Sequence, residues 1–238
     1  MSTRRIRAMF RKELRDYRRN GNVIVTMVIL PLIFLIQPLV IIFKLSAASA
    51  AEVSQRPLLL YMLAIPALVP ATIAASAVVS ERQQATLEPV LTTPIEREEL
   101  LIGKALAVLL PSVALSYMVF ALFVACVALF APHGIGAALL RGPLLLAQVV
   151  FTPLIAAWSI WIGMAISTRT NDVRTAQQFS LLASLPSIAV SSYLAFSGFP
   201  TTLALALALG AALLILDVVG WRAISAIFDR ERLITGTG

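Results

Sequence analysis

The residues from Ser80 to Lys104 read SERQQATLEPVLTTPIEREELLIGK and form a polar interruption of 25 residues in an otherwise apolar chain. The segment carries five glutamates against two arginines and one lysine, so it is net negative in a protein of net charge +7. Pro89 and Pro94 divide it, because proline lacks an N–H donor and moves the preceding residue out of the α region. We therefore predict a short helix around Gln83–Glu88 and a second helix that begins near Pro94, with Thr93 as its N-cap. Both a solvated loop between two spans and a folded element that a partner protein binds fit these residues.

The composition of the whole chain indicates a membrane protein. Of its 238 residues, 59% are hydrophobic and only 13% are charged, which is typical of a polytopic membrane protein rather than a soluble domain. Cys126 is the single cysteine and His133 the single histidine. The sequence therefore excludes an intrachain disulfide and most metal or general-base sites.

Six apolar stretches are long enough to cross a bilayer, since about 20 helical residues span a hydrocarbon core of roughly 30 Å. The fifth stretch is rich in serine, and a partly re-entrant fifth segment stays an alternative. Four residues, Ser197–Pro200, join the last two stretches, which predicts a tight hairpin. We expect an all-α integral membrane fold with residues 23–220 as a six-span domain and residues 221–238 as a cytoplasmic C-terminal tail. The predicted spans are residues 23–43, 58–79, 105–130, 144–167, 179–196 and 201–219.

Basic residues are distributed unevenly between the two sides of the predicted membrane. With a cytoplasmic N-terminus, 16 arginines and lysines lie on the inner side and three (Lys44, Arg56 and Arg141) on the outer side. This bias predicts that both termini are cytoplasmic. It also accounts for the net charge without nucleic acid as a partner.

Residues 1–22 combine basic side chains with an apolar stripe. Ile6, Phe10 and Leu14 follow each other at intervals of four, with Met9 and Tyr17 on the same side. This spacing predicts an amphipathic helix that lies on anionic lipid headgroups.

The predicted spans contain little that supports chemistry. Asp217 is their only charged residue, near the cytoplasmic end of the sixth span, and either has a function or simply lies at the interface. Gln37 and Gln148 are mid-span amides that either hold helices together or line a path. This scarcity argues against a secondary transporter or proton relay. A P-loop is absent from the sequence, so the chain does not bind ATP in the usual way. An intramembrane enzyme and a non-transporting membrane scaffold are the alternatives from other classes.

The run from Glu81 to Pro94, followed by Gly103-Lys104, resembles the first cytoplasmic loop of type-2 ABC-transporter permeases. That loop commonly reads E-R-E-x-G-T-L-E-x-L-L-x-T-P before a G-K pair, and this chain departs from it at Gln83, Ala85 and Glu96. The resemblance implies an ATPase-coupling loop that comprises Glu81, Arg82, Thr86, Leu87, Glu88, Pro89, Val90, Leu91, Thr93, Pro94, Gly103 and Lys104. RKELRDYRRNGN at Arg11–Asn22 is similar to the connecting helix of these permeases. The connecting-helix residues implied are Phe10, Arg11, Lys12, Glu13, Leu14, Arg15, Tyr17 and Arg18.

The resemblance implies that the chain is the membrane subunit of an ABC exporter in a bacterial plasma membrane. Two separate ATPase subunits would bind ATP and magnesium, so the chain itself would hold no cofactor. A second permease copy would complete the path, either as a homodimer or as a heterodimer with a related permease. With so few charges in the spans, an amphipathic or apolar cargo such as a drug or lipid fits, and ion or polymer export stay alternatives.

Overall fold

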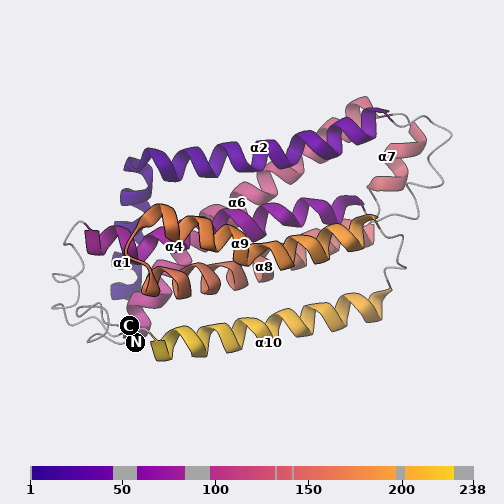
Figure 1. Cartoon of the computed structure of the whole chain (residues 1–238). Helices are drawn as coiled ribbons and strands as arrows, with labels where there is room; N and C mark the ends of the chain where they lie inside the picture. Colours follow the sequence, from indigo (N-terminus) through magenta and orange to yellow (C-terminus); the bar gives the residue numbers. More distant parts are fainter. Residues whose placement is uncertain are drawn as a thin grey trace.

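The protein is a bundle of helices in the computed structural model, which describes residues 2–44, 58–83, 97–131, 133–140, 142–196 and 202–227. Figure 1 shows the long helices side by side, with α1 lying across one end of the bundle and α7 at the other. We call these the α1 end and the α7 end. The elements in chain order are α1 (Thr3–Arg19), α2 (Gly21–Lys44), η2 (Leu58–Leu63, a 3₁₀ helix), α4 (Ala64–Gln83), α6 (Arg97–Phe130), α7 (His133–Leu139), α8 (Gly142–Arg169), α9 (Val173–Phe196) and α10 (Leu203–Ile227).

Six helical stretches are long and apolar enough to cross a membrane, which confirms the predicted all-α fold with six spans. Their outward faces carry large apolar side chains, such as Ile36 on α2 and Leu203 on α10, as expected for helices in lipid. The stretches are Val23–Val40, Leu58–Ala77, Glu98–Phe130, Gly142–Arg169, Val173–Phe196 and Leu203–Ile227.

Helix α4 lies at the centre of the bundle and packs mainly along α8 and α9. Residues 64–77 are buried without exception. Many of them are alanines, and small side chains allow neighbouring helices to approach closely where a hydrophobic driving force is absent. The core of the protein is therefore built around one helix that lipid does not reach.

Gly163 on α8 marks the closest approach to α4. A Cβ atom at this position would lie 2.4 Å from the carbonyl oxygen of Ala71 and 3.0 Å from the backbone nitrogen of Ala75. Both atoms belong to the α4 backbone and cannot rotate away. Only glycine fits here.

The start of the second span differs from the regular helix that its sequence predicts. Residues Leu58–Leu63 form a 3₁₀ helix, and the α-helix begins at Ala64. Pro66 therefore falls in the first turn of α4, where the missing N–H of proline would be unpaired in any case. Pro70 lies inside α4.

The fifth span is one continuous helix, so the structure does not show the re-entrant alternative. Helix α9 begins at Val173, six residues before the predicted start of the span. Asp172 caps it, since its Oδ2 accepts hydrogen bonds from the Thr175 backbone N–H at 2.8 Å and from the Thr175 hydroxyl at 2.9 Å. These two bonds hold the pKa of Asp172 below its ordinary value.

The last span packs differently from the predicted hairpin. Helix α10 runs antiparallel to α9 (Figure 1), but it packs chiefly on α8. It also continues to Ile227, past the residue at which the C-terminal tail was expected to begin. A further element that the sequence did not predict is α7, whose Ile135 and Leu139 are buried in the main core.

The orientation of the bundle in the membrane is open to a direct test. Single cysteines at Ala137 on α7 and at Asn171 between α8 and α9, in a Cys126→Ala background, occupy exposed positions at opposite ends. Because the basic residues predict a cytoplasmic α1 end, an impermeant thiol reagent should label the cysteine at 137 in intact cells and the cysteine at 171 only after permeabilisation. Labelling of both from the same side would contradict the six-span topology.

Candidate functional site

Helix α1 is held against the bundle by a buried face that matches the predicted stripe only in part. Its two buried residues are Met9 and Glu13, whereas Ile6, Phe10 and Leu14 are only partly buried. Met9 and Glu13 are four residues apart and share one side of the helix. An acidic side chain therefore occupies the deepest position of a helix that is otherwise strongly basic.

The partner of Glu13 is Lys104 on α6. The Lys104 side chain is fully buried, and its Nζ donates to Oε1 of Glu13 at 3.0 Å and to the backbone oxygen of Ala77 on α4 at 3.2 Å. One ammonium group thus connects α1, α6 and α4. Charge-assisted hydrogen bonds of this kind are about twice as strong as neutral ones.

Gly103 makes this contact possible. A Cβ on Gly103 would lie 2.8 Å from the Cβ of Met9, so only glycine allows α1 to lie this close to α6. The Gly-Lys pair therefore has two physical roles, since glycine admits the helix and lysine binds its carboxylate. We call the contact of Met9, Glu13, Ala77, Gly103 and Lys104 the Lys104 junction.

The charge balance of the Lys104 junction keeps Glu13 ionised. Burial alone would raise the pKa of Glu13, but the ammonium groups of Lys104 and Lys12 outweigh it and hold the pKa below the ordinary value of 4.5. Lys12 Nζ lies 3.2 Å from the same Oε1 and 3.6 Å from Asp16, and its side chain is partly exposed. A buried carboxylate is stable here because two cations surround it.

A second contact fixes the start of α1 to α6. Glu99 is buried, and its carboxylate accepts from the backbone N–H of Ser2 and from Arg5 Nη1, the latter at 3.4 Å. The Arg5 side chain is 43% exposed, so this pair is weaker than the buried one. Helix α1 is thus tied to α6 at two points, about two and a half turns apart along α1.

The end of α4 is tied to the turn between α8 and α9. The backbone N–H of Val79 donates to Ser167 Oγ at 3.2 Å, and Gln83 Nε2 donates to the backbone oxygen of Asn171 at 3.0 Å. Residues 84–96 follow directly and lie outside the described part of the chain. The last residues of α4 are therefore tied to α8 and to the turn that follows it, as Glu99 on α6 is tied to α1.

The family model of ABC-2 family transporter proteins matches residues 7–212, which includes both partners of the buried ion pair. The chain belongs to this family. It is a membrane permease of an ABC transporter, a transmembrane subunit that is not itself catalytic and that associates with an ATPase subunit. No curated protein matches the chain.

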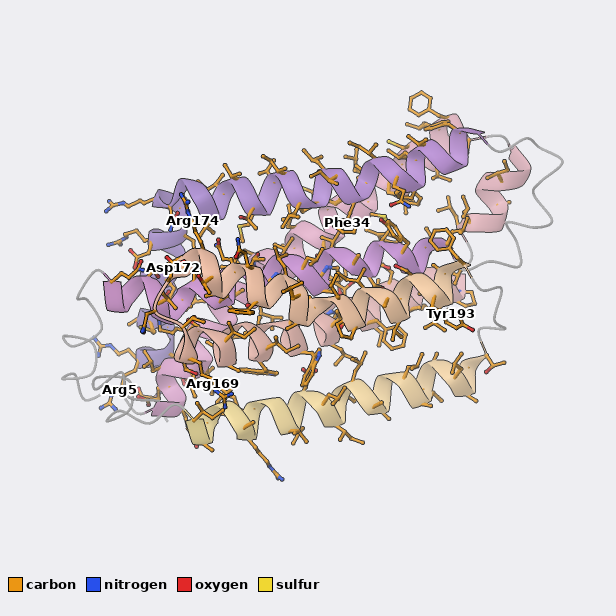
Figure 2. The ribbon with its side chains drawn as sticks, in the orientation of Figure 1. Arg5, Phe34, Arg169, Asp172, Arg174 and Tyr193 are labelled. Atoms are coloured by element: carbon orange, nitrogen blue, oxygen red, sulfur yellow. The ribbon has the colours of Figure 1, made fainter. Side chains whose placement is uncertain are left out.

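The predicted coupling-loop residues of this permease fall into two groups. Gly103 and Lys104 lie in the Lys104 junction, and Glu81 and Arg82 lie in the last turn of α4. Figure 2 shows Arg5, Arg169, Asp172 and Arg174 at the same end of the permease and Tyr193 near the other. The residues outside the described part of the chain are Thr86, Leu87, Glu88, Pro89, Val90, Leu91, Thr93 and Pro94. Of the predicted helix around Gln83–Glu88, only Gln83 is described, as the last residue of α4. The predicted helix from Pro94 is described only from Arg97, where α6 begins.

The predicted connecting-helix residues all lie on α1. Lys12 and Glu13 take part in the Lys104 junction, as described above, and the others surround it. Phe10, Leu14 and Tyr17 are partly buried, whereas Arg11, Arg15 and Arg18 are exposed. The exposed arginines leave the outer face of α1 strongly basic.

The three polar residues predicted for the spans do not meet in this permease. Gln37 on α2 accepts a hydrogen bond from the Tyr61 hydroxyl. Gln148 on α8 is buried, with Nε2 3.5 Å from Thr152 Oγ1 and with no partner for Oε1 among the described residues. Asp217 on α10 accepts from the Trp161 side chain. They lie on three different helices.

The sequence predicted both members of the buried ion pair as site residues but not their contact. The available signal was Glu13 itself, an acid that falls between Met9 and Tyr17 on the apolar side of α1 at intervals of four. An acid in such a position requires a buried cation, and Lys104 directly precedes a predicted span on the predicted cytoplasmic side.

Proposed function

We propose that the permease is the membrane subunit of an ATP-driven exporter, with its α1 end in the cytoplasm and two ATPase subunits bound there. The observation that carries this proposal is the buried Glu13–Lys104 pair. It joins the connecting helix to two spans beside both ends of the segment 84–96. A binding partner that displaces this segment or α1 therefore moves α4 and α6 with it.

The path for cargo lies between two permease copies in this proposal. The chain holds no ATP, magnesium or other cofactor, which belong to the ATPase subunits. An amphipathic or apolar compound, such as a drug or lipid, fits the spans predicted from the sequence, in which Asp217 is the only charged residue. The membrane is a bacterial plasma membrane, and the second copy is identical or a related permease.

The experiment that tests the proposal is purification of the chain with and without the ATPase encoded beside it. Alone, the permease should hydrolyse no ATP. With the ATPase it should co-purify, and hydrolysis should rise when an apolar cargo is added. A scaffold without transport activity would show neither co-purification nor stimulation.

A substitution at Leu87 tests the coupling segment. Leu87, Val90 and Leu91 are spaced three and four apart, so one helical turn would place them together on a docking face. Leu87→Asp would bury an unpaired charge there, which typically costs about 2–5 kcal/mol and weakens binding by roughly 30-fold or more. We expect normal membrane levels but loss of ATPase binding and transport, with Leu87→Met as the matched control. Full transport by Leu87→Asp would make the segment a passive linker.

A further inference from the structure

Helix α10 contacts the rest of the bundle through few residues. Along its whole length, Leu203–Ile227, the buried residues are Gly220 and Ile224. The indole ring of Trp161 on α8 packs directly against Gly220. A Cβ on Gly220 would lie 2.8 Å from Trp161 Cδ1, so a larger residue would push the ring away. The Trp161 and Trp221 rings meet edge to face, with centroids 5.5 Å apart and an interplanar angle of 67°. Two indoles therefore lie together where α10 meets α8.

Asp217 is placed beside these two rings. It precedes Trp221 by four residues and shares its side of α10. The Trp161 side chain donates a hydrogen bond to its carboxylate. The other acceptor, Oδ1, is buried and finds no donor among the described residues. A carboxylate in an apolar span is costly unless a cation or donor satisfies it.

The surroundings of Asp217 define the ligand that would satisfy it. Indole rings attract cations through their negatively charged faces within about 6 Å of the ring centre. Asp217, Trp161 and Trp221 are each only partly buried, so the outer surface of the bundle gives access to them. The large apolar residues around them on α10, including Leu214 and Val218, are exposed and would contact an apolar body. The group that fits is a positive charge carried by a hydrophobic molecule.

We propose that Asp217, Trp161 and Trp221 form a binding site for lipophilic organic cations at the contact of α8 and α10. The carboxylate neutralises the charge, the indoles contact the cationic centre, and the apolar faces of the helices hold the rest of the molecule. That such a cation is cargo rests on the proposed exporter function, whereas the binding itself does not. Asp217, Gly220 and Trp221 lie beyond residue 212, where the match to the family model ends.

Intrinsic fluorescence reports on this site directly, because two of the three tryptophans of the chain belong to it. In a Trp158→Phe background, Trp161 and Trp221 are the only fluorophores of this kind. The purified full chain in detergent is titrated with tetraphenylphosphonium and, separately, with tetraphenylborate, an anion of nearly the same shape. We expect saturable quenching by the cation and no saturable quenching by the anion.

Asp217→Asn separates a ligand site from simple helix packing. The amide oxygen still accepts from Trp161, so the contact of α8 and α10 and the melting temperature should be unchanged. The lost charge should weaken tetraphenylphosphonium binding by about tenfold or more, as expected for a charge pair shielded from water. Trp221→Phe, which keeps a ring with a weaker cation attraction, should weaken binding less.

Three results would overturn the inference: no saturable quenching by the cation, equal affinity in Asp217→Asn, or equal quenching by tetraphenylborate. The measurement needs no ATPase, so it is independent of the test of the proposed function. If the chain binds the cation but never associates with an ATPase, the proposed binding site is supported and the proposed exporter function is refuted. If the chain associates with an ATPase but does not bind the cation, only the proposed binding site is refuted.

Discussion

Gly163→Ala should strongly destabilise the permease, although the same replacement within an ordinary helix stabilises it by about 1 kcal/mol. The added Cβ would lie 2.4 Å from the Ala71 carbonyl oxygen, so α4 and α8 must move apart along their main contact. Overpacking of a core typically costs about 1–3 kcal/mol. Here the clash is with backbone, so we expect the upper end of that range. The melting temperature in detergent and the yield of monodisperse protein measure it.

Gly142 provides the matched control on the same helix. A Cβ there meets no atom within 4 Å, so Gly142→Ala should leave the melting temperature unchanged or raise it. The two alanine variants add the same atoms to α8, Gly142→Ala at its first residue and Gly163→Ala in its interior, and only the atoms at position 163 would clash with another helix. Equal melting temperatures would show that α4 and α8 do not approach as closely as the structure describes.

Breaking the Glu13–Lys104 pair should have an effect at least as large as that of Gly163→Ala. Glu13→Leu leaves a fully buried ammonium without its carboxylate, and removing one partner of a buried pair typically costs about 3–5 kcal/mol. Lys104→Met leaves the buried carboxylate of Glu13 with Lys12 alone, whose side chain is partly exposed. Both single variants should lose ATPase coupling and membrane level together, as measured by transport and by quantitative immunoblotting. Arg5→Ala is the control, because its side chain is 43% exposed and such pairs contribute roughly 0–1 kcal/mol.

Double variants test whether stability depends on the ion pair itself or only on the absence of an unpaired buried charge. Glu13→Leu with Lys104→Met replaces both ions by apolar groups and should recover stability, since such replacements are often neutral. The exchanged pair, Glu13→Lys with Lys104→Glu, should recover less, because the Ala77 carbonyl only accepts hydrogen bonds and would face a carboxylate. Better recovery by the exchanged pair would mean that the bond to Ala77 is unimportant.

The pH dependence of the junction follows from the lowered pKa of Glu13. A depressed carboxyl pKa adds stability above the pKa of the unfolded chain, and this contribution is lost as the pH falls through the folded value. The ion pair should therefore persist at neutral pH and fail only below 4.5.

The overall architecture was predictable because its signals are local. An apolar stretch of sufficient length specifies a span without reference to any other residue, and all six spans are found. The basic helix at the N-terminus was equally visible in its periodicity. The loop motif that ends at Gly103-Lys104 predicted the protein family, and the match of the family model to residues 7–212 confirms it.

The packing between helices could not be predicted, because it depends on residues far apart in the sequence. Glu13 and Lys104 are separated by 91 positions, and their contact depends on how α1 lies across the bundle. The hairpin prediction for the last two spans gave their antiparallel direction but not their packing, for the same reason. A short connection brings α9 and α10 close at one end, but Gly220 and Trp161 direct α10 towards α8.

The central position of α4 also constrains the order in which the protein is assembled. Its principal neighbour α8 ends at Arg169, 86 residues after Gln83, and at roughly 5–20 residues per second its synthesis takes several seconds more. Until then α4 must reside in the bilayer without α8 and α9, along which it mainly packs. Its hydroxyl groups are already satisfied within the helix, since Thr72 donates to the Val69 oxygen at 2.9 Å and Ser76 to the Ile73 oxygen at 2.8 Å. A newly inserted α4 can therefore remain in the lipid until α8 and α9 pack around it. The hydroxyl groups of Thr72 and Ser76 keep the same hydrogen-bond acceptors throughout.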